Sequence, residues 1–172
     1  MHEFPALPPR PWWHWLAVSA VVIALDLATK AWIVAIFREG EELRVTGFFS
    51  VILAYNSGAA FSFLAGASGA RWFFAGIAVV ASVFLVWMLT RGGSRLLMSG
   101  IALILGGALG NLWDRIAIGR VTDFLLFHYA GWSWPAFNVA DSAITVGAAL
   151  LILDGFRVGR RDAASAASSD SR

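Results

Sequence analysis

Long apolar runs with few charges dominate the pattern of residues along this chain. A bilayer core needs roughly 20 residues of helix to cross it, and four runs reach that length: about 12–37, 72–90, 96–113 and 134–153. The second and third runs carry no charged residue, and the fourth carries only Asp141. We therefore predict an all-α integral membrane protein with four transmembrane helices, built as a single polytopic domain over residues 1–172.

A fifth apolar stretch, over residues 45–66, has a different character. It holds Asn56, several Ser and Gly residues, and a cluster of aromatic and β-branched residues at 48–52. This mixture is typical of short strands and an interfacial segment. We expect a small extracytoplasmic β-rich or interfacial segment within the outer loop 38–71, between the first two helices, where it could serve as a platform or lid.

The distribution of basic residues predicts the orientation. Four spans place both termini on one side, together with the loop 91–95, and Lys and Arg favour the cytoplasmic side. The basic residues near the membrane on that side are Arg10, Arg91, Arg95, Arg157, Arg160 and Arg161. Both termini are therefore expected in the cytoplasm. The Ala-, Ser- and Asp-rich end, from about 160 to 172, is expected to be a disordered tail.

The composition agrees with a membrane protein and excludes several other classes. Of the 172 residues, 59% are hydrophobic and 14% charged, whereas soluble domains carry about 45–50% apolar and about 25% charged residues. A soluble enzyme and a disordered chain are therefore excluded. The net charge of +2 comes from scattered Lys and Arg, which does not fit a nucleic-acid binder. With no Cys and three scattered His, we expect neither a disulfide nor a metal site.

The polar residues within and beside the spans converge on one membrane face. Ionisable groups inside a membrane are candidates for function by default. With a rise of about 1.5 Å per residue, four spans place nine polar side chains near the outer leaflet. They are Asp26, Lys30, Asn56, Asn111, Asp114, Arg115, Asp123, Asn138 and Asp141. A single polar site opening toward that leaflet follows.

Structural explanations remain open for most members of this set. They include an intrahelical ion pair (Asp26 with Lys30), a helix end (Asp114, Arg115), interhelical hydrogen bonds (Asn111, Asn138) and a solvated loop acid (Asp123). The neighbouring Gly-rich segment 106–110, which ends at Gly110, indicates close helix packing. Asp141 is hardest to explain structurally, because it is the only charge in its span and has no basic residue within one turn.

Two of the acids suit the activation of water beside a substrate carbonyl. Two neighbouring carboxylates resist double ionisation and share a proton, so one can deprotonate water while the other polarises a carbonyl. Asp123 and Asp141 form the natural pair because neither has an adjacent basic residue. Serine-nucleophile and phosphate-loop patterns are absent from the sequence.

Five separated segments resemble the bacterial lipoprotein signal peptidases, also called signal peptidase II. They are DLATK at 26–30, NSGAAFS at 56–62, GGALGNLWDR at 106–115, VTDF at 121–124 and FNVADS at 137–142. The resemblance implies an intramembrane aspartyl endopeptidase with Asp123 and Asp141 as its catalytic dyad. Its substrate would be a prolipoprotein carrying a diacylglyceryl group on a cysteine, with cleavage just before that cysteine.

The resemblance also implies roles for the surrounding residues. Asn56, Asn111, Arg115 and Asn138 would line the site and position the dyad or the substrate backbone. Asp26 and Lys30 would support it, and Asp114, Gly110 and Ala140 lie within the same motifs. A guanidinium at Arg115 can hold a backbone carbonyl through several donors.

The resemblance further implies a multi-pass protein of the bacterial inner membrane, surrounded by phospholipid. Its site would lie near the outer leaflet, and it would need no cofactor, metal, nucleic acid or oligomer. Two other classes stay open on the sequence: a small transporter or proton channel that uses intramembrane Asp and Lys groups, and a noncatalytic lipid or lipoprotein binder.

Overall fold

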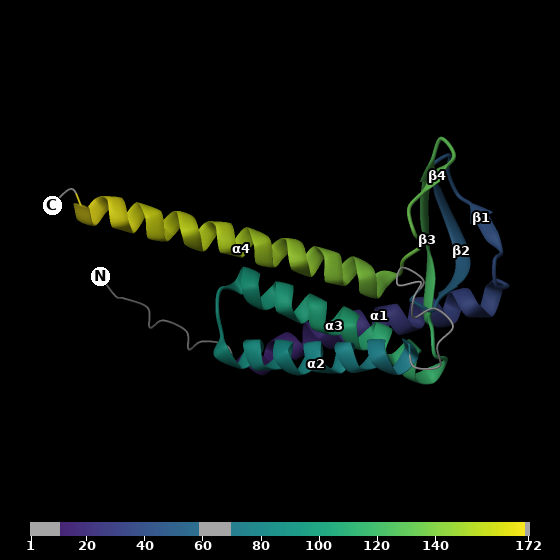
Figure 1. The fold of residues 1–172 in the computed structure, drawn as a ribbon, viewed down its shortest axis with the longest axis horizontal. Helices are drawn as coiled ribbons and strands as arrows, with labels where there is room; N and C mark the ends of the chain where they lie inside the picture. The colour runs from purple at the N-terminus through teal and green to yellow at the C-terminus, as the bar shows by residue number, and fades with distance from the viewer. Residues whose placement is uncertain (1–10, 59–69, 171–172) are drawn as a thin grey trace, which may run out of the picture.

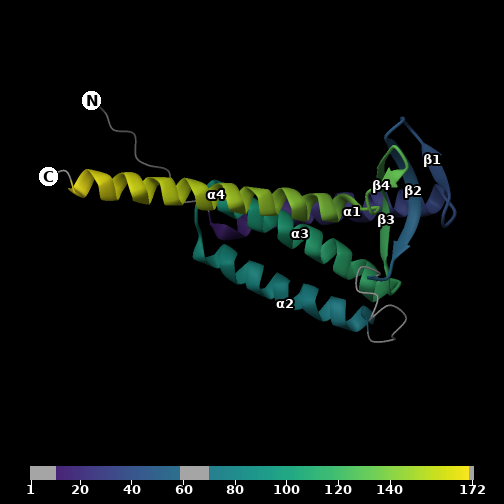
Figure 2. The same cartoon turned by 45° about the horizontal axis from the view of Figure 1, so that its top comes forward.

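The computed structural model describes residues 11–58 and 70–170, which form a helical bundle with a small sheet at one end (Figure 1). The helices are η1 (Trp12–His14), α1 (Trp15–Ile36), α2 (Ala70–Arg91), α3 (Arg95–Ala117) and α4 (Val139–Asp170). The strands are β1 (Glu42–Arg44), β2 (Phe49–Asn56), β3 (Val121–Tyr129) and β4 (Trp132–Ser133). The sheet lies where α1 and α3 end and where α2 and α4 begin, and a second view shows the same arrangement (Figure 2).

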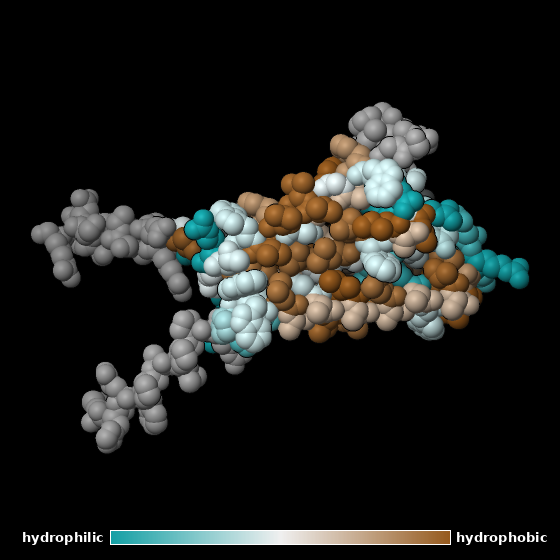
Figure 3. All heavy atoms as spheres, turned by 90° about the horizontal axis from the view of Figure 1, so that it is seen from below, coloured by the Kyte–Doolittle hydropathy of each residue, from teal (hydrophilic) through white to brown (hydrophobic). Residues whose placement is uncertain are grey.

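The prediction of four membrane-spanning helices is confirmed. Four helices are long and apolar enough to cross a bilayer: Trp12–Ile36, Arg71–Arg91, Arg95–Ala117 and Val139–Arg160. Many large apolar side chains on these helices face outward, as Trp32, Val80 and Phe156 do. Figure 3 shows the resulting apolar surface between two more polar ends. A surface of this kind suits a lipid environment, since soluble proteins rarely expose such a large apolar area.

Helix α3 forms the centre of the bundle and packs against α1, α2 and α4. Glycines allow these close approaches. A Cβ on Gly106 would lie 2.8 Å from the backbone oxygen of Ser19 in α1, and a Cβ on Gly147 of α4 would lie 2.6 Å from that of Gly100 in α3. The Ser19 hydroxyl also donates to the Ala102 carbonyl at 2.8 Å. The Gly-rich segment therefore serves helix packing, as its composition indicated.

The sheet joins the two halves of the chain. Its antiparallel order is β1-β2-β3-β4, so β2, which follows α1, pairs with β3, which follows α3. The central pairing places Ala54 opposite Asp123. A buried cluster of Ile33 from α1, Leu53 from β2 and Phe124 from β3 holds the sheet against the bundle. Since β3 begins four residues after α3 ends, its first residues stay close to the helix ends.

Three details differ from the expectations drawn from the sequence. The sheet includes β3 and β4 between α3 and α4, whereas strands were expected only between the first two helices. The fourth helix starts at Val139, because 134–137 is extended: the Trp134 N–H bonds to Phe127 O at 2.8 Å and the Phe137 N–H to Leu125 O at 3.0 Å. The helix runs on to Asp170, where a disordered tail was expected from about 160. Residues 59–66 of the expected interfacial segment lie outside the described residues.

Candidate active site

The polar residues singled out in the sequence come together at the sheet end of the bundle. Four elements supply the buried or half-buried members. They are Asp26 and Lys30 from α1, Asn111, Asp114 and Arg115 from α3, Asp123 from β3, and Asn138 and Asp141 at the start of α4. Direct hydrogen bonds and ion pairs link seven of these eight side chains into one network.

Asn138 and Asp141 cap the start of α4 by a reciprocal pair of hydrogen bonds. The Asp141 N–H donates to the Asn138 side-chain oxygen at 2.9 Å, and the Asn138 N–H donates to Asp141 Oδ2 at 3.3 Å. This is the capping-box arrangement, with Asn and Asp in the two roles. The helix N-terminus favours negative charge nearby. The turn that starts α4 therefore also fixes the position of the Asp141 carboxylate.

Asp123 lies on β3 with only 2% of its surface exposed. Its Oδ1 accepts a hydrogen bond of 2.8 Å from the Asn138 amide nitrogen. Burial, followed by the charge of Asp141, raises the pKa of Asp123 to about 7, while Asn56, Asn138 and Lys30 partly oppose that increase. With this pKa, the Asp123 carboxyl keeps its proton in part of the molecules at neutral pH.

Asn111 connects the two sides of the site. Its amide nitrogen donates to Asp141 Oδ1 at 2.8 Å. Its side-chain oxygen accepts from Lys30 at 3.0 Å and from the Asn138 amide at 3.1 Å. Two amides thus join Asp123 and Asp141 through a short chain of hydrogen bonds, which places the two aspartates in one site.

A buried ion cluster supports this arrangement from behind. Lys30 Nζ lies 2.8 Å from Asp26 Oδ2 and 3.1 Å from Asp114 Oδ2. The other Asp26 oxygen accepts from the Ala140 N–H at 2.9 Å, which ties α1 to the start of α4. Gly110 makes room for this carboxylate, because a Cβ there would lie 2.6 Å from Asp26 Oδ2. Asp114 also accepts from the Thr122 N–H at 2.8 Å, which fixes the start of β3.

Arg115 and Asn56 lie at the edge of the site. The half-buried Arg115 guanidinium donates to the Asn111 backbone oxygen at 3.2 Å and interacts with the charges of Asp141, Asp123 and Asp114. It is placed to donate to a group beside the aspartates. Asn56 is exposed at the end of β2, and its side-chain oxygen accepts from the Gly58 N–H at 2.9 Å.

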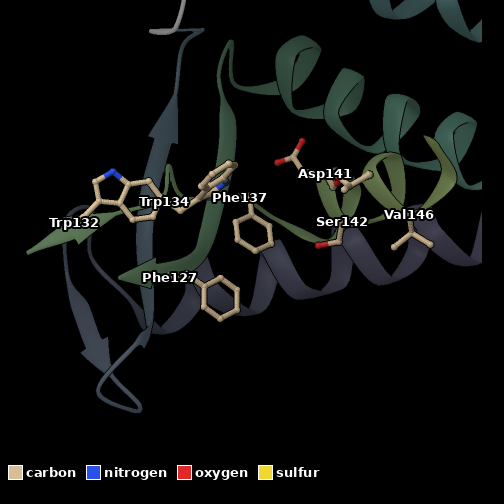
Figure 4. A pocket seen from close by; sticks show the side chains of 8 residues that line it. Phe127, Trp132, Trp134, Phe137, Asp141, Ser142 and Val146 are labelled. Carbon is tan, nitrogen blue, oxygen red and sulfur yellow. The ribbon is translucent and has the colours of Figure 1, made fainter. Parts of the chain in front are cut away.

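An aromatic pocket of about 640 Å³ opens beside Asp141 (Figure 4). Its lining comes from β3, β4, the extended segment before α4 and the first two turns of α4: Phe127, Trp132, Trp134, Phe137, Asp141, Ser142, Thr145 and Val146. The Phe127 and Phe137 rings stack with their centroids 5.9 Å apart. The predicted site thus has an apolar recess next to one of its acids.

Reasoning from the sequence did not identify this aromatic wall or the role of Thr122. The alternation of Leu125, Phe127 and Tyr129 in 121–129 is the signal of a strand, but the strand is short and follows closely after a span. Thr122 contributes backbone groups, which residue type does not reveal: its N–H binds Asp114 and its carbonyl accepts from Asn138 at 3.2 Å. Among the described residues, no group of three His, Cys, Asp or Glu side chains is placed to bind a metal.

The comparisons with known proteins identify relatives for most of the chain. The family described as signal peptidase (SPase) II matches residues 18–157. The lipoprotein signal peptidases of Ralstonia nicotianae and Cupriavidus necator are each 54% identical to the chain over 149 residues, covering 86% of this chain and 86% and 85% of theirs. A bacterial membrane enzyme solved at 1.9 Å by the in meso method has a TM-score of 0.75 and 30% identity, covering 82% of this chain and 91% of its own.

Proposed function

The chain belongs to the signal peptidase II family, and on this basis we propose that Asp123 and Asp141 form its catalytic pair. It is an aspartic endopeptidase that removes signal peptides from prolipoproteins. The observation that carries the proposal is the bridge between the two acids: Asn138 donates to Asp123, Asn111 donates to Asp141, and Asn138 donates to Asn111.

The surroundings of the two acids assign them different roles. Both Asp141 oxygens accept hydrogen bonds, from the Asn111 amide and from the Asn138 backbone, and the carboxylate lies at a helix N-terminus. These donors and the helix N-terminus face the Asp141 carboxylate, so we assign Asp141 the role of the base. Asp123 is deeply buried with a pKa raised to about 7, so Asp123 is the acid.

The reaction follows from these two proposed roles. Asp141 takes a proton from water as the water oxygen bonds to the scissile carbonyl carbon, and Asp123 gives its proton to the carbonyl oxygen. When the intermediate collapses, the C–N bond breaks and the leaving amine takes the proton from Asp141. The hydroxyl proton returns to Asp123, which restores the starting state. Arg115, at the edge of the site, is placed to hold a substrate carbonyl.

We propose the finer features of the substrate from the family resemblance. The precursor carries a diacylglyceryl-modified cysteine, and the cut falls just before that cysteine. The aromatic pocket beside Asp141 offers an apolar wall for the part of the precursor next to the cleaved bond. Phospholipid surrounds the membrane-spanning helices. A single chain supplies every group of the proposed mechanism, so the mechanism needs no oligomer.

The test is cleavage of a lipidated precursor by single-site variants. Asp123→Asn and Asp141→Asn should each lower kcat by at least about 10³-fold, since each removes a proton-transfer group. Asp154→Asn is the matched control: Asp154 is a buried acid on α4 that bonds to Ser94, at the other end of the bundle. Normal turnover by either dyad variant, with the control active, would reject the proposed pair.

The transport alternative lacks support. A relay needs polar groups through the depth of the membrane, whereas the buried ionisable side chains of the described residues gather at the sheet end, apart from Asp154. Proton flux across proteoliposomes should therefore match that of empty vesicles.

We propose that the protein resides in the bacterial inner membrane with both termini in the cytoplasm and the sheet outside. Arg91, Arg95 and Arg157 support this orientation, because they lie near the end of the bundle away from the sheet. Since the chain has no native cysteine, single Cys variants can test it. In spheroplasts, a membrane-impermeant maleimide should label Ser133→Cys but not Arg95→Cys, and the reverse pattern would invert the topology.

A further inference from the structure

Lys30 is a buried cation whose contacts extend beyond an ion pair. Only 3% of its surface is exposed. Its three ammonium protons face three acceptors: Asp26 Oδ2 at 2.8 Å, Asn111 Oδ1 at 3.0 Å and Asp114 Oδ2 at 3.1 Å. Two of these acceptors are carboxylates that lie behind the site, whereas the third is an amide that contacts Asp141 directly. This third contact is the one that a purely electrostatic role leaves unexplained.

The contact with Lys30 is one of two that orient the Asn111 amide; the other comes from the Asn138 amide nitrogen, which also donates to the Asn111 oxygen, at 3.1 Å. A carboxamide presents an acceptor oxygen on one side and a donor nitrogen on the other, whereas an ammonium only donates. The atom of Asn111 that faces Lys30 must therefore be its oxygen. The nitrogen is consequently turned toward Asp141, to which it donates at 2.8 Å.

Without the ammonium, the Asn138 donor alone would hold this orientation against two unpaired carboxylates. Asp26 and Asp114 would then present carboxylate oxygens with no cation beside them. Such oxygens attract an N–H donor, so the Asn111 nitrogen would turn toward them. Its oxygen would then face the Asp141 carboxylate, and two acceptors in contact repel each other. Asp141 would lose a donor and gain an unfavourable neighbour.

We propose that Lys30 is a positioning residue, which holds the Asn111 amide in the orientation that donates to Asp141 and so keeps the Asp141 carboxylate in position to accept a proton from water. This inference rests on the proposed catalytic pair. The titratable groups around Lys30 and the pair are Asp26 on α1, Asp114 and Arg115 on α3, Asp123 on β3 and Asp141 on α4. The alternative is that Lys30 only neutralises the acids behind the site.

The absence of cysteine in this chain permits an isosteric test. Lys30→Cys creates a single thiol, which is alkylated in denaturing detergent before the protein is refolded into lipid micelles. In each reaction the thiolate sulfur forms the new bond to carbon and bromide leaves. 2-Bromoethylamine gives a side chain with the length and ammonium of lysine, and 1-bromopropane gives the same length ending in a methyl group. Wild-type protein taken through both reactions controls for refolding.

The measured quantities are kcat and KM for the lipidated precursor, each per folded molecule. The aminoethyl protein should recover kcat to within about threefold of the treated wild type. The propyl protein should have a kcat lower by roughly 10- to 150-fold, the range for loss of a hydrogen bond to a charged group. Its KM should stay within about threefold, because Lys30 is almost fully buried.

A folded propyl protein with the kcat of the aminoethyl protein would overturn the proposal. If the propyl protein does not fold, the double variant Asp26→Asn, Asp114→Asn is compared with the same two changes combined with Lys30→Met, which leaves neither carboxylate partner of Lys30 unpaired. Positioning requires the triple variant to lose at least about tenfold more kcat than the double variant, and equal losses would leave Lys30 as an ion-pair partner only. The dyad variants are tested separately, so failure here leaves the catalytic pair standing.

Discussion

Replacing Asp123 with Asn should stabilise the enzyme at alkaline pH while removing its activity. The Asn138 amide donates to Asp123 Oδ1 at 2.8 Å, and an Asn side-chain oxygen can accept that same hydrogen bond. What the variant removes is a carboxyl that must ionise in a buried position beside Asp141. Ionisation there opposes folding, so the benefit of the neutral amide depends on pH.

The magnitude follows from the raised pKa of Asp123. Folding raises this pKa from 3.8 to about 7, so the proton is bound more tightly in the folded state and stabilises it at low pH. That stability is lost as the pH rises through about 7. Between pH 5 and pH 8 the folded carboxyl ionises while the unfolded one is ionised at both, and linkage gives a loss of about 2–3 kcal/mol of unfolding free energy. The Asp123→Asn variant should not lose this unfolding free energy, because its amide does not ionise.

The assay is unfolding in lipid micelles at pH 5 and pH 8, followed by the fluorescence of the 9 Trp residues. The advantage of Asp123→Asn over the wild type in unfolding free energy should be larger at pH 8 than at pH 5 by about 2–3 kcal/mol. Glu39→Gln serves as the control, because Glu39 is an exposed acid paired with Arg120 at 3.4 Å, and it should follow the wild type. A stability difference between Asp123→Asn and wild type that is the same at both pH values would refute the reasoning.

Three further outcomes are expected. The kcat/KM for the precursor should fall as the pH rises above about 7, because Asp123, whose pKa is about 7, loses the proton it gives to the substrate; a flat pH–rate profile from 6 to 9 would contradict this. Gly110→Ala should lower the unfolding free energy measured by denaturant titration by about 1–3 kcal/mol, because the Cβ of the alanine would lie 2.6 Å from Asp26 Oδ2. Ser94→Ala should cost about 1–2 kcal/mol without changing kcat, because Ser94 caps the Leu97 N–H at 3.0 Å and bonds to Asp154; an unchanged melting temperature would oppose that result.

The spans and the convergence of polar residues could be predicted from the sequence because both depend on one-dimensional quantities. A run of apolar residues has a length, and a residue within it has a depth. Asp26 and Asp141 are 115 positions apart in the chain, yet helix rise alone placed them at one membrane face. In the structure, the N–H of Ala140, the neighbour of Asp141, donates a hydrogen bond to Asp26.

The strands after α3 could not be predicted in the same way. Residues 134–137 are apolar and precede a span, so composition assigns them to a helix. Their extended conformation depends on pairing with β3, where Phe137 bonds to Leu125, and such pairing is a tertiary contact that composition does not contain. Pro135 and the capping pair of Asn138 and Asp141 were the local signals for a later helix start.

The contacts that each residue makes within the buried network could not be predicted from the sequence either. Residue types suggested that Lys30 pairs with Asp26, since they lie four positions apart on a helix. The contact between Lys30 and Asn111 depends on how α1 packs against α3. Only the structure shows that one cation contacts both the supporting acids and the amide that donates to Asp141.

The pairing of β2 with β3 has a consequence for the order in which the protein is made. The site takes Lys30 from the first helix, Asn111 from the third and Asp141 from the fourth, and the strands that brace it come from both halves of the chain. A nascent chain that has not yet emerged past residue 141 therefore contains no complete site, however much of it has entered the bilayer. On the proposed mechanism, proteolytic activity therefore begins only once the start of α4 has joined the bundle, so its onset reports that all four helices are assembled.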